Sequence, residues 1–474
     1  MYEFGSVSAG RQDPSGHWID VRNPYDGALV GRVAAAERAS VLAAVERVRN
    51  RRLDLPRHER AAILERMAAA LGRDRDEVSR RITAESGLSL RDASHEVERA
   101  RDVLRFAAMQ ALADDSSVFP CDVSPNGNRR RIYTTRQPLR LVAAITPFNH
   151  PLNQVVHKVA PAIASNNKIV LKPSLDAPLS AHYLAVLALE CGLPPDAFNV
   201  FAGPTAEVAE PLVKSELVDM ITFTGSTAVG RRIAALAGYK RVVLELGGNS
   251  ACLVLEDANV EEAVAIALRG VFPNSGQRCT AIRRLLVHEQ LATEFATRLA
   301  EKASALRHGD PSDPATEVGT LIHEDAAKLV ESRVEETLRA GARLLTGHRR
   351  RGACYAPTVL DGVENHHPVV ASETFGPVAS IIRFSTLDEA IALANRTPYG
   401  LSGAVVSQHW PSIQRVVTEL DTGAVNVNEA PSFRLESSPF GGVKSSGLGY
   451  KEGVVEAIRG MTWLKTYSLP WDVP

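Results

Sequence analysis

Four short apolar runs decide the fold of this chain: LVAAIT (141–146), KIVLK (168–172), NVFAG (199–203) and MITFTG (220–225). Each has the length and the β-rich composition of a buried strand. A helical stretch, SAHYLAVLALE (180–190), lies between the second and the third run. Strands that alternate with helices predict a parallel sheet covered by helices, because parallel strands need a crossover connection. The sequence therefore predicts an α/β fold.

The segments on either side extend this pattern. Residues 37–115 show apolar residues at helical spacing with charges between them. Residues 119–132 (FPCDVSPNGNRRRI) are rich in Pro, Asn and Gly and predict a turn or hairpin. A second alternation of strand-like and helical stretches covers about residues 250–435. The final run MTWLKTYSL (461–469) is strand-like and would expose an apolar edge, which indicates subunit association.

Length and composition argue against several classes of protein. A chain of 474 residues is too long for one hydrophobic core, so we expect two or three domains. Its 45% hydrophobic and 23% charged residues are typical of a globular protein. The formal net charge of −1 argues against a general affinity for nucleic acid or for an acidic membrane surface. No apolar run approaches the roughly 20 residues that span a bilayer.

The cysteines and the first residues indicate a reducing compartment. The chain has five cysteines, an odd number without a CxxC pair, which argues against a disulfide framework and against a zinc site. The start MYEFGSVSAGRQD lacks the basic-then-apolar pattern of a signal peptide. We therefore expect a cytoplasmic protein that holds no metal.

Two strand ends carry residues that suit a phosphate or a ribose. In ITFTGSTAVG (221–230) a strand ends before Gly225, and Ser226 would cap the helix that follows. A helix N-terminus after a strand attracts phosphate, although an ordinary strand–helix turn has the same pattern. In LKPS (171–174), Lys172 ends another strand, at the edge where parallel sheets bind ligands. A surface lysine is the alternative.

Three polar residues have the chemistry of a catalytic site. Cys279 stands in SGQRCTA, where Arg278 adds a positive charge that would favour the thiolate; an unreactive buried cysteine is the alternative. Glu245 lies in the apolar run LELGGNS, where a carboxylate is either salt-bridged or kept for proton transfer. Asn149, between two prolines in TPFNHP, would donate to a developing oxyanion or form a turn.

These segments, in this order, resemble the aldehyde dehydrogenase superfamily. Further matches are VRNPYDGALVGRV (21–33), ETFGP (373–377), ANRTPYGLSG (394–403) and PFGGVKSSGLG (439–449). The resemblance covers about residues 20–468, and the ordered set is far more specific than any single motif. It implies the aldehyde dehydrogenase fold: a Rossmann-like cofactor domain, an α/β catalytic domain and a small β oligomerisation flap.

The resemblance also implies domain boundaries and an assembly. The NAD(P)-binding domain would take residues 1–118 and 139–246, and the catalytic domain would take residues 247–438. The flap and tail would take residues 119–138 and 439–474. A homodimer or homotetramer is implied.

The catalytic roles follow from the same resemblance. Cys279 would attack the aldehyde carbon and form a thiohemiacetal, whose oxyanion the Asn149 side chain and the Cys279 backbone N–H would stabilise. Hydride transfer to the nicotinamide would leave a thioester, and Glu245 would activate the water that hydrolyses it. The positions that would bind the cofactor are Thr146, Phe148, Lys172, Ser174, Gly225, Ser226, Glu373 and Phe375.

The sequence departs from the family at a position that bears on the cofactor. NAD-preferring members often place a glutamate three residues after the lysine, where it binds the adenosine ribose. Here that residue is Leu175, followed by Asp176. Without the glutamate a 2′-phosphate meets less repulsion, and Ser174 could contact it. NAD is the expected cofactor because no arginine stands nearby in the sequence, and NADP stays an alternative.

Cationic residues occupy the positions that contact the substrate in this family: Arg99, His150, Arg278 and Arg434. In members that take apolar aldehydes these positions are mostly aromatic or aliphatic. A buried arginine needs an anionic partner, and the alternatives to substrate binding are a salt bridge from Arg99 to Glu96 or Asp102, or simple exposure of the Arg99 side chain. Several cations at one site indicate a small aldehyde with an anionic end.

Three longer motifs narrow the substrate further. TPFNHPLNQVVHK, NSGQRCTAIRR and ESSPFGGVKSSGLGYKEG are most similar to those of phosphonoacetaldehyde dehydrogenases. A phosphonate aldehyde, phosphonoacetaldehyde or phosphonoformaldehyde, is therefore the expected substrate. Succinate semialdehyde and sulfoacetaldehyde stay open as alternatives. So do a CoA-acylating relative, against which Glu245 argues, and a non-enzymatic relative, against which the intact Cys279, Glu245 and Asn149 argue.

Overall fold

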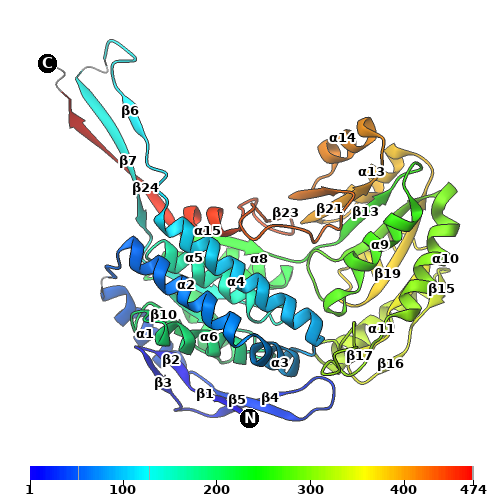
Figure 1. Ribbon diagram of the computed structural model, residues 1–474, viewed down its shortest axis with the longest axis horizontal. Coiled ribbons are helices and arrows are strands. Elements are labelled where there is room, and N and C mark those ends of the chain that lie inside the picture. Colours follow the sequence, from blue (N-terminus) through cyan, green and yellow to red (C-terminus); the bar gives the residue numbers. More distant parts are fainter. Residues whose placement is uncertain (52, 127–128, 472–474) are drawn as a thin grey trace.

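The computed structural model describes residues 1–51, 53–126 and 129–471, and the two largest sheets among them lie side by side (Figure 1). The first sheet has the strand order β12-β11-β8-β9-β10-β2-β3. Strands β8 to β12 are parallel, whereas β2 and β3 form an antiparallel edge. The strand bounds are β2 Ser6–Ser8, β3 Arg11–Asp13, β8 Leu141–Ile145, β9 Lys168–Lys172, β10 Phe198–Val200, β11 Met220–Thr224 and β12 Arg241–Glu245.

The chain order of these strands reverses at β8. From β8 the sheet continues through β9 and β10 on one side and through β11 and β12 on the other. Such a switch point opens a crevice at the carboxyl ends of the strands, where open α/β sheets bind their ligands. The topology therefore marks the ends of β8 and β11 as the place to look for a site.

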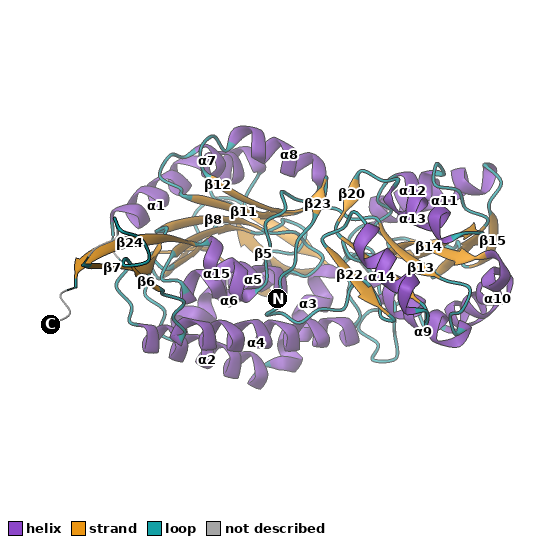
Figure 2. Ribbon diagram, turned by 90° about the horizontal axis from the view of Figure 1, so that it is seen from above, coloured by secondary structure: helices purple, strands orange, loops and turns teal. Residues whose placement is uncertain are grey.

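Helices cover both faces of this sheet (Figure 2). On one face α2, α4, α5 and α6 share a buried core with the strands, and on the other α1, α7 and α8 do so. Within the described part of the chain, no helix combines the length and apolar character that a membrane crossing requires. The helix bounds are α1 Arg38–Asn50, α2 Arg57–Arg73, α3 Arg75–Ser86, α4 Leu90–Leu112, α5 Asn153–Ala164, α6 Leu179–Glu190, α7 Glu210–Lys214 and α8 Thr227–Leu236.

The second sheet has the order β15-β18-β19-β14-β13-β21-β22, and its pairings are parallel except that of β15 with β18. Its strands are β13 Ser250–Val254, β14 Ile282–His288, β15 Arg343–Thr346, β18 Thr358–Asp361, β19 Val378–Phe384, β21 Ser402–Val406 and β22 Ala424–Val427. The associated helices are α9 Val260–Val271, α10 Glu289–Ala305, α11 Glu324–Arg339, α12 Pro368–Ala371, α13 Leu387–Asn395 and α14 Trp410–Glu419.

A small sheet, which we call the flap, projects from the body and carries the C-terminal end of the chain (Figure 1). In it β24 (Thr462–Pro470) pairs antiparallel with β7 (Arg130–Pro138), and β6 (Val118–Pro120) lies on the other side of β7. Tyr133 and Tyr467 stack across the two long strands, with ring centroids 5.4 Å apart. The flap thus joins the predicted hairpin to the last strand-like run.

The remaining elements are short. The strands β1 Tyr2–Phe4, β4 Trp18–Arg22 and β5 Leu29–Ala34 form a sheet of their own, which the sequence patterns did not predict because these strands lack a continuous apolar run. Two ribbons are β16 Arg350–Arg351 with β17 Cys354–Tyr355, and β20 Tyr399–Gly400 with β23 Val443–Lys444. Three short helices complete the described elements: the π-helix η1 Thr205–Ala209, the 3-10 helix η2 Pro273–Gly276 and α15 Val454–Gly460.

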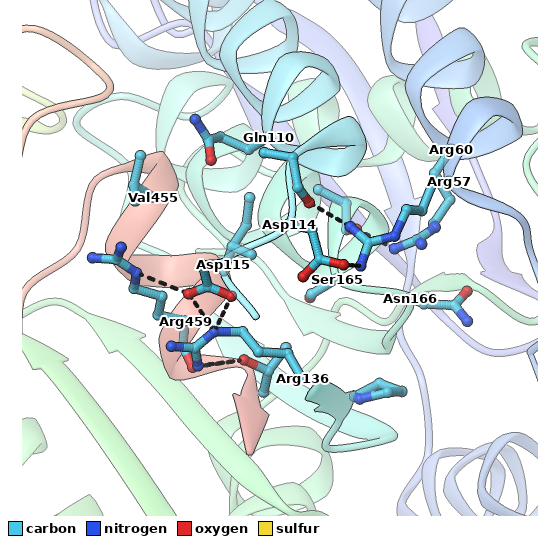
Figure 3. Close-up of a pocket in the computed structure, with 15 residues that line it drawn as sticks. Arg57, Arg60, Gln110, Asp114, Asp115, Arg136, Ser165, Asn166, Val455 and Arg459 are labelled. Carbon is cyan, nitrogen blue, oxygen red and sulfur yellow. Dashed lines mark hydrogen bonds and ion pairs between the residues drawn. The ribbon is translucent and has the colours of Figure 1, made fainter. Parts of the chain in front are cut away.

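A cavity of about 200 Å³ lies where the flap joins the body (Figure 3). Arg136 of β7 and Arg459 of α15 contact Asp115 there, at 2.7 and 3.5 Å. Arg57 and Arg60 of α2 line the opposite wall. These ion pairs fasten the flap to the helices, and none of the described lining residues belongs to the predicted site.

We expect the flap to hold subunits together, because β24 is an edge strand with Trp463 and Leu469 exposed. The double variant Trp463→Asp, Leu469→Asp should be monomeric by size-exclusion chromatography with light scattering, since burying charges at an apolar contact is costly. Thr466→Asp, which adds a charge on the opposite face of β24, is the control and should leave the assembly intact. A monomeric wild type, or an unchanged mass for the double variant, would contradict the expectation.

Candidate active site

Three predicted site residues, together with Thr224, lie at the carboxyl ends of adjacent parallel strands. Glu245 ends β12, Thr224 ends β11, Thr146 follows β8, and Lys172 ends β9. The backbone continues the sheet at this edge, because Thr146 N donates to Lys172 O at 3.1 Å and Gly225 N donates to Glu245 O at 3.0 Å. The switch point of the sheet therefore collects them along one edge, as the strand pattern predicts.

This edge carries polar groups that lack partners inside the protein. Among the described residues, the hydroxyls of Thr146 and Thr224 are buried without a hydrogen-bond partner. Lys172 is buried as well, its Nζ donates to Pro173 O at 3.1 Å, and burial lowers its pKa to about 8. Because buried polar groups are normally hydrogen-bonded, this edge has the character of a ligand site.

The turn after β11 has the predicted geometry of an anion site. Ser226 caps α8, and its Oγ accepts a hydrogen bond from Val229 N at 3.5 Å. The free N–H groups at the start of α8 lie next to Gly225. Ser174, on the exposed loop after β9, donates instead to Asp176 Oδ2 at 3.1 Å.

The second sheet contributes residues from loops at the amino ends of two adjacent strands. Cys279 precedes β14, and Glu373 and Phe375 precede β19. Phe375 packs edge-to-face against Phe148, with ring centroids 6.2 Å apart. Glu373 Oε1 accepts a hydrogen bond from Gly248 N at 3.0 Å. Contacts between the loops of the two sheets thus assemble the site.

A link of four residues between β12 and β13 brings the sheets together. Gly248 in this link lies against the backbone of Cys279, because a Cβ added there would stand 2.1 Å from Cys279 O. Only glycine permits so close an approach. We call this contact between the two sheets the seam. Glu245 and Cys279 are therefore held close together, one on each side of the seam.

The Cys279 thiol lies in a setting that keeps it protonated. Burial raises its pKa to about 12, and the charges of Glu373 and Glu245 add to this effect. Arg434 opposes the shift. The sequence suggested that Arg278 would favour the thiolate, but burial outweighs any such effect. The Arg278 Nη2 atom donates to Arg269 O at 2.9 Å, at the end of α9.

Asn149 is tied to the loop that carries the thiol. Its Nδ2 donates to Gln277 O at 2.8 Å, and its own carbonyl accepts from Asn274 Nδ2 at 2.8 Å. Asn274 adopts a left-handed backbone with φ of 61°, a conformation that asparagine tolerates. The sequence patterns missed Asn274, although the FPNSGQ run before Cys279 shows a turn-forming composition.

Glu245 is buried, and neither carboxylate oxygen has a hydrogen-bond partner among the described residues. Burial raises its pKa well above the ordinary value, and the charge of Glu452 raises it further. Lys158 opposes this rise and binds Glu452, with Nζ 2.8 Å from Oε1. Of the two alternatives for this carboxylate, a direct salt bridge is therefore wrong, and proton transfer remains.

Two of the predicted substrate residues converge on Glu436. The Nε atom of Arg99 lies 2.5 Å from Oε1 of Glu436, and the Nη2 atom of Arg434 lies 3.7 Å from its Oε2. The ion pair of Arg99 with Glu96 or Asp102 that the sequence suggested is therefore wrong. Its partner lies 337 residues away in the chain, which no local pattern reveals.

The other two predicted substrate residues, His150 and Arg278, lie within electrostatic range of Arg99. Burial lowers the pKa of His150, and the charges of Arg99 and Arg278 lower it further, whereas Glu96 opposes them. Burial, and after it Arg99, lowers the pKa of Arg278 to about 10 against the opposing charge of Asp92. The structure therefore brings all four predicted residues together, and we call Arg99, His150, Arg278 and Arg434 the cationic cluster.

Arg283 is a further buried residue at the site that the sequence patterns missed. Its Nη1 donates to Gly376 O at 3.0 Å, its Nη2 donates to Arg278 O at 3.1 Å, and its guanidinium lies over the Phe375 ring at 5.6 Å. It thereby joins the Cys279 loop to the Phe375 loop. Burial lowers its pKa to about 10, and Glu373 opposes this shift.

The described residues contain no group of three or more His, Cys, Asp or Glu side chains placed to hold a metal ion. All five cysteines are free thiols. His366 and His367 pack against each other, and His367 Nδ1 accepts a hydrogen bond from Glu364 N at 3.1 Å.

Sequence and structure comparisons identify the family. The model of the aldehyde dehydrogenase family matches residues 11–467, and the chain belongs to this family. Aspartate-semialdehyde dehydrogenase 1 of Pseudomonas canavaninivorans is 39% identical over 95% of this chain and 96% of its own length. The 3-sulfolactaldehyde dehydrogenase of Priestia aryabhattai is 35% identical over 97% of this chain and 96% of its own length.

A solved structure has the same fold. The crystal structure of aldehyde dehydrogenase 21 from Physcomitrella patens, in complex with the reaction product succinate, superimposes with a TM-score of 0.96. Its sequence is 32% identical, and the match covers 99% of this chain and 98% of that one. The predicted aldehyde dehydrogenase fold is thereby confirmed, whereas the residue roles and the phosphonate substrate remain predictions.

The reactivity of the thiol should follow its raised pKa. Because so little thiolate exists near neutrality, the alkylation rate of Cys279 by iodoacetamide should rise about tenfold per pH unit between about pH 7 and pH 9. Peptide mass spectrometry of the ligand-free protein would measure this rate, with Cys279→Ser confirming which peptide is labelled. A rate that levels off below about pH 8 would contradict the expected shift.

Proposed function

We propose that this protein oxidises a small anionic aldehyde to the carboxylate with NAD or NADP as the hydride acceptor. The observation that carries the proposal is the cationic cluster beside Cys279, since Arg434 acts electrostatically on both Cys279 and Glu245. Three kinds of group are then present at one seam: a nucleophile, a buried base and cations for an anion. Family membership supports the reaction class.

Cys279 is the proposed nucleophile. The thiol proton passes to a base, for which the neighbouring Glu245 carboxylate is the candidate. The Sγ thiolate then forms the bond to the aldehyde carbon, and the carbonyl oxygen takes the negative charge of the thiohemiacetal. The Asn149 amide and the Cys279 backbone N–H are the donors for that oxygen. The hydrogen bonds that fix Asn149 to the Cys279 loop support this pairing.

The polar edge of the first sheet fits a dinucleotide. The unpartnered hydroxyls of Thr146 and Thr224 and the buried Lys172 would contact it, and the start of α8 at Ser226 suits a pyrophosphate. Glu373 would bind a ribose. When bound, the nicotinamide ring accepts the hydride that the oxidation releases.

Glu245 is the proposed base for hydrolysis of the resulting thioester. Its oxygens lack partners among the described residues, so a water molecule can approach them. A carboxyl whose pKa is raised by burial accepts a proton near neutral pH more readily than an exposed one. This base favours water over CoA as the acyl acceptor, and its presence beside Cys279 and Asn149 argues against a purely structural role.

The anionic end of the substrate is the finer part of the proposal. The motifs around Asn149, Cys279 and Arg434 favour phosphonoacetaldehyde or phosphonoformaldehyde. A second candidate class, sulfonate and carboxylate aldehydes, is supported by the relatives, which are named for aspartate semialdehyde and 3-sulfolactaldehyde or hold succinate. All of these substrates present an anion that guanidinium groups bind.

Steady-state kinetics tests the proposal. The value of kcat/KM should be higher for phosphonate, sulfonate and carboxylate aldehydes than for propionaldehyde, and the product should be the free acid even when CoA is present. Arg278→Leu should raise KM for the anionic aldehydes about 10- to 100-fold and leave propionaldehyde nearly unchanged, because it removes charge-assisted hydrogen bonds.

Arg269→Leu is the matched control for Arg278. Arg269 lies near the end of α9, and its backbone oxygen accepts the hydrogen bond from Arg278. Its own side chain is exposed and pairs with Glu429 at 3.1 Å. Its loss should leave the ratio between anionic and neutral aldehydes unchanged. Equal effects of Arg278→Leu on both kinds of aldehyde would refute its part in anion binding.

The residue after Ser174 should control the use of NADP. Leu175→Glu places a carboxylate at the position where NAD-preferring relatives carry one, so it should repel a 2′-phosphate. We expect kcat/KM for NADP to fall at least about tenfold relative to that for NAD, measured with one aldehyde. Leu175→Gln, which adds bulk without charge, should have a much smaller effect on this ratio. If both variants lower it equally, the shape of the side chain and not its charge causes the change.

A further inference from the structure

Glu436 is a carboxylate set permanently among the cations that the proposed function uses for the substrate. It lies between β22 and β23 and is 6% exposed. Its Oε1 accepts from Arg99 Nε, and its Oε2 lies 2.6 Å from His157 Nε2 and 3.7 Å from Arg434 Nη2. Its backbone is fixed as well, because Val454 N donates to Glu436 O at 3.1 Å.

The ionised form of Glu436 is strongly favoured. Burial opposes ionisation, but the hydrogen bond with His157 and the charges of Arg99 and Arg434 hold the pKa of Glu436 well below its ordinary value. Burial lowers the pKa of His157, so this ring adds little positive charge near neutral pH. Glu436 therefore carries a full negative charge next to two arginines.

Two other carboxylates near the cluster, Glu96 and Asp92, bind the backbone and each also face one cluster residue: Glu96 Oε2 lies 3.7 Å from His150 Nδ1, and Asp92 acts electrostatically on Arg278. Glu96 Oε1 accepts from Leu152 N and Asn153 N, at 2.8 and 2.9 Å, at the start of α5. Asp92 Oδ2 accepts from Asn274 N at 2.8 Å. Their geometry serves the two loops that carry Asn149 and Cys279. Glu436 differs, because both of its carboxylate oxygens contact guanidinium or imidazole groups.

A charge count shows what this arrangement does to an incoming anion. Arg278 faces the opposite charge of Asp92, so this pair adds no net charge. Arg99 and Arg434 bring two positive charges, and Glu436 cancels one of them at contact distance. A substrate group with one negative charge is then balanced by the one positive charge that remains. A doubly charged group must place its second charge close to the Glu436 carboxylate, where like charges repel most strongly because the surroundings are buried.

We propose that Glu436 sets the substrate charge, so that the cationic cluster accepts an aldehyde with one negative charge in preference to one with two. The inference rests on the proposed function and deepens it. It favours sulfonate and carboxylate aldehydes over fully ionised phosphonates. Glu436 is thus a specificity-determining residue that acts through Arg99 and Arg434.

Two inhibitors of equal length separate charge from shape. Ethanesulfonate carries one negative charge, and ethylphosphonate carries two at an alkaline pH where it is fully ionised. Their inhibition constants against the aldehyde, and their dissociation constants by calorimetry, would be measured for the whole enzyme at that pH. The wild type should bind ethanesulfonate more tightly than ethylphosphonate. Glu436→Gln should increase the affinity for ethylphosphonate about tenfold relative to the affinity for ethanesulfonate.

Two further variants guard against a merely structural effect. Glu436→Asp keeps the charge and should keep the wild-type preference. Asp361→Asn removes another buried carboxylate that pairs with two arginines, Arg343 and Arg383, at the edge of the second sheet. It should cost stability, seen as a lower Tm, without changing the ratio of the two inhibition constants.

The outcomes separate this inference from the function on which it rests. If neither anion binds the wild type, anion recognition fails and the role of Glu436 fails with it. If both bind but the ratio is the same in Glu436→Gln, only the role of Glu436 is overturned. If Glu436→Gln does not fold, the wild type still decides, since tighter binding of ethylphosphonate than of ethanesulfonate would refute the inference.

Discussion

The close approach of two backbones at Gly248 is the constraint on which the site depends. The first sheet supplies groups from the carboxyl ends of its strands, and the second sheet supplies groups from the amino ends of β14 and β19. They meet only because Gly248 lets the link between the sheets lie against Cys279. A side chain there would push the thiol away from Glu245. The arrangement of the side chains at the seam therefore depends on this backbone contact.

Much of the fold is predictable because its signals are local. The runs that end in Thr146, Lys172 and Thr224 have strand composition, and Ser226 has the identity of a helix cap, so each can be recognised within a few residues. The edge of the sheet at which these residues gather follows from the general rule for parallel strands. The location of these strand ends can therefore be predicted from the sequence.

The parts that could not be predicted depend on contacts between distant segments. The partner of Arg99 lies in a loop that the chain reaches only after the whole second sheet, so sequence spacing points instead to neighbours on the same helix. Arg283 and Asn274 show the same limit, since their partners lie on other loops. The raised pKa of the Cys279 thiol shows a related limit. A nearby arginine can be seen in the sequence, whereas the depth of burial cannot.

The partner of Arg99 also changes how the cationic cluster is understood. Buried arginines side by side repel each other and would each need a counter-charge in the absence of substrate. A fixed carboxylate supplies it, so the guanidinium groups are held in place before the substrate arrives and little ordering remains for the binding step. The same carboxylate must then be tolerated by whatever anion binds. The carboxylate that holds the arginines in place therefore also selects the charge of the substrate. Both properties depend on Glu436, so they can be lost only together.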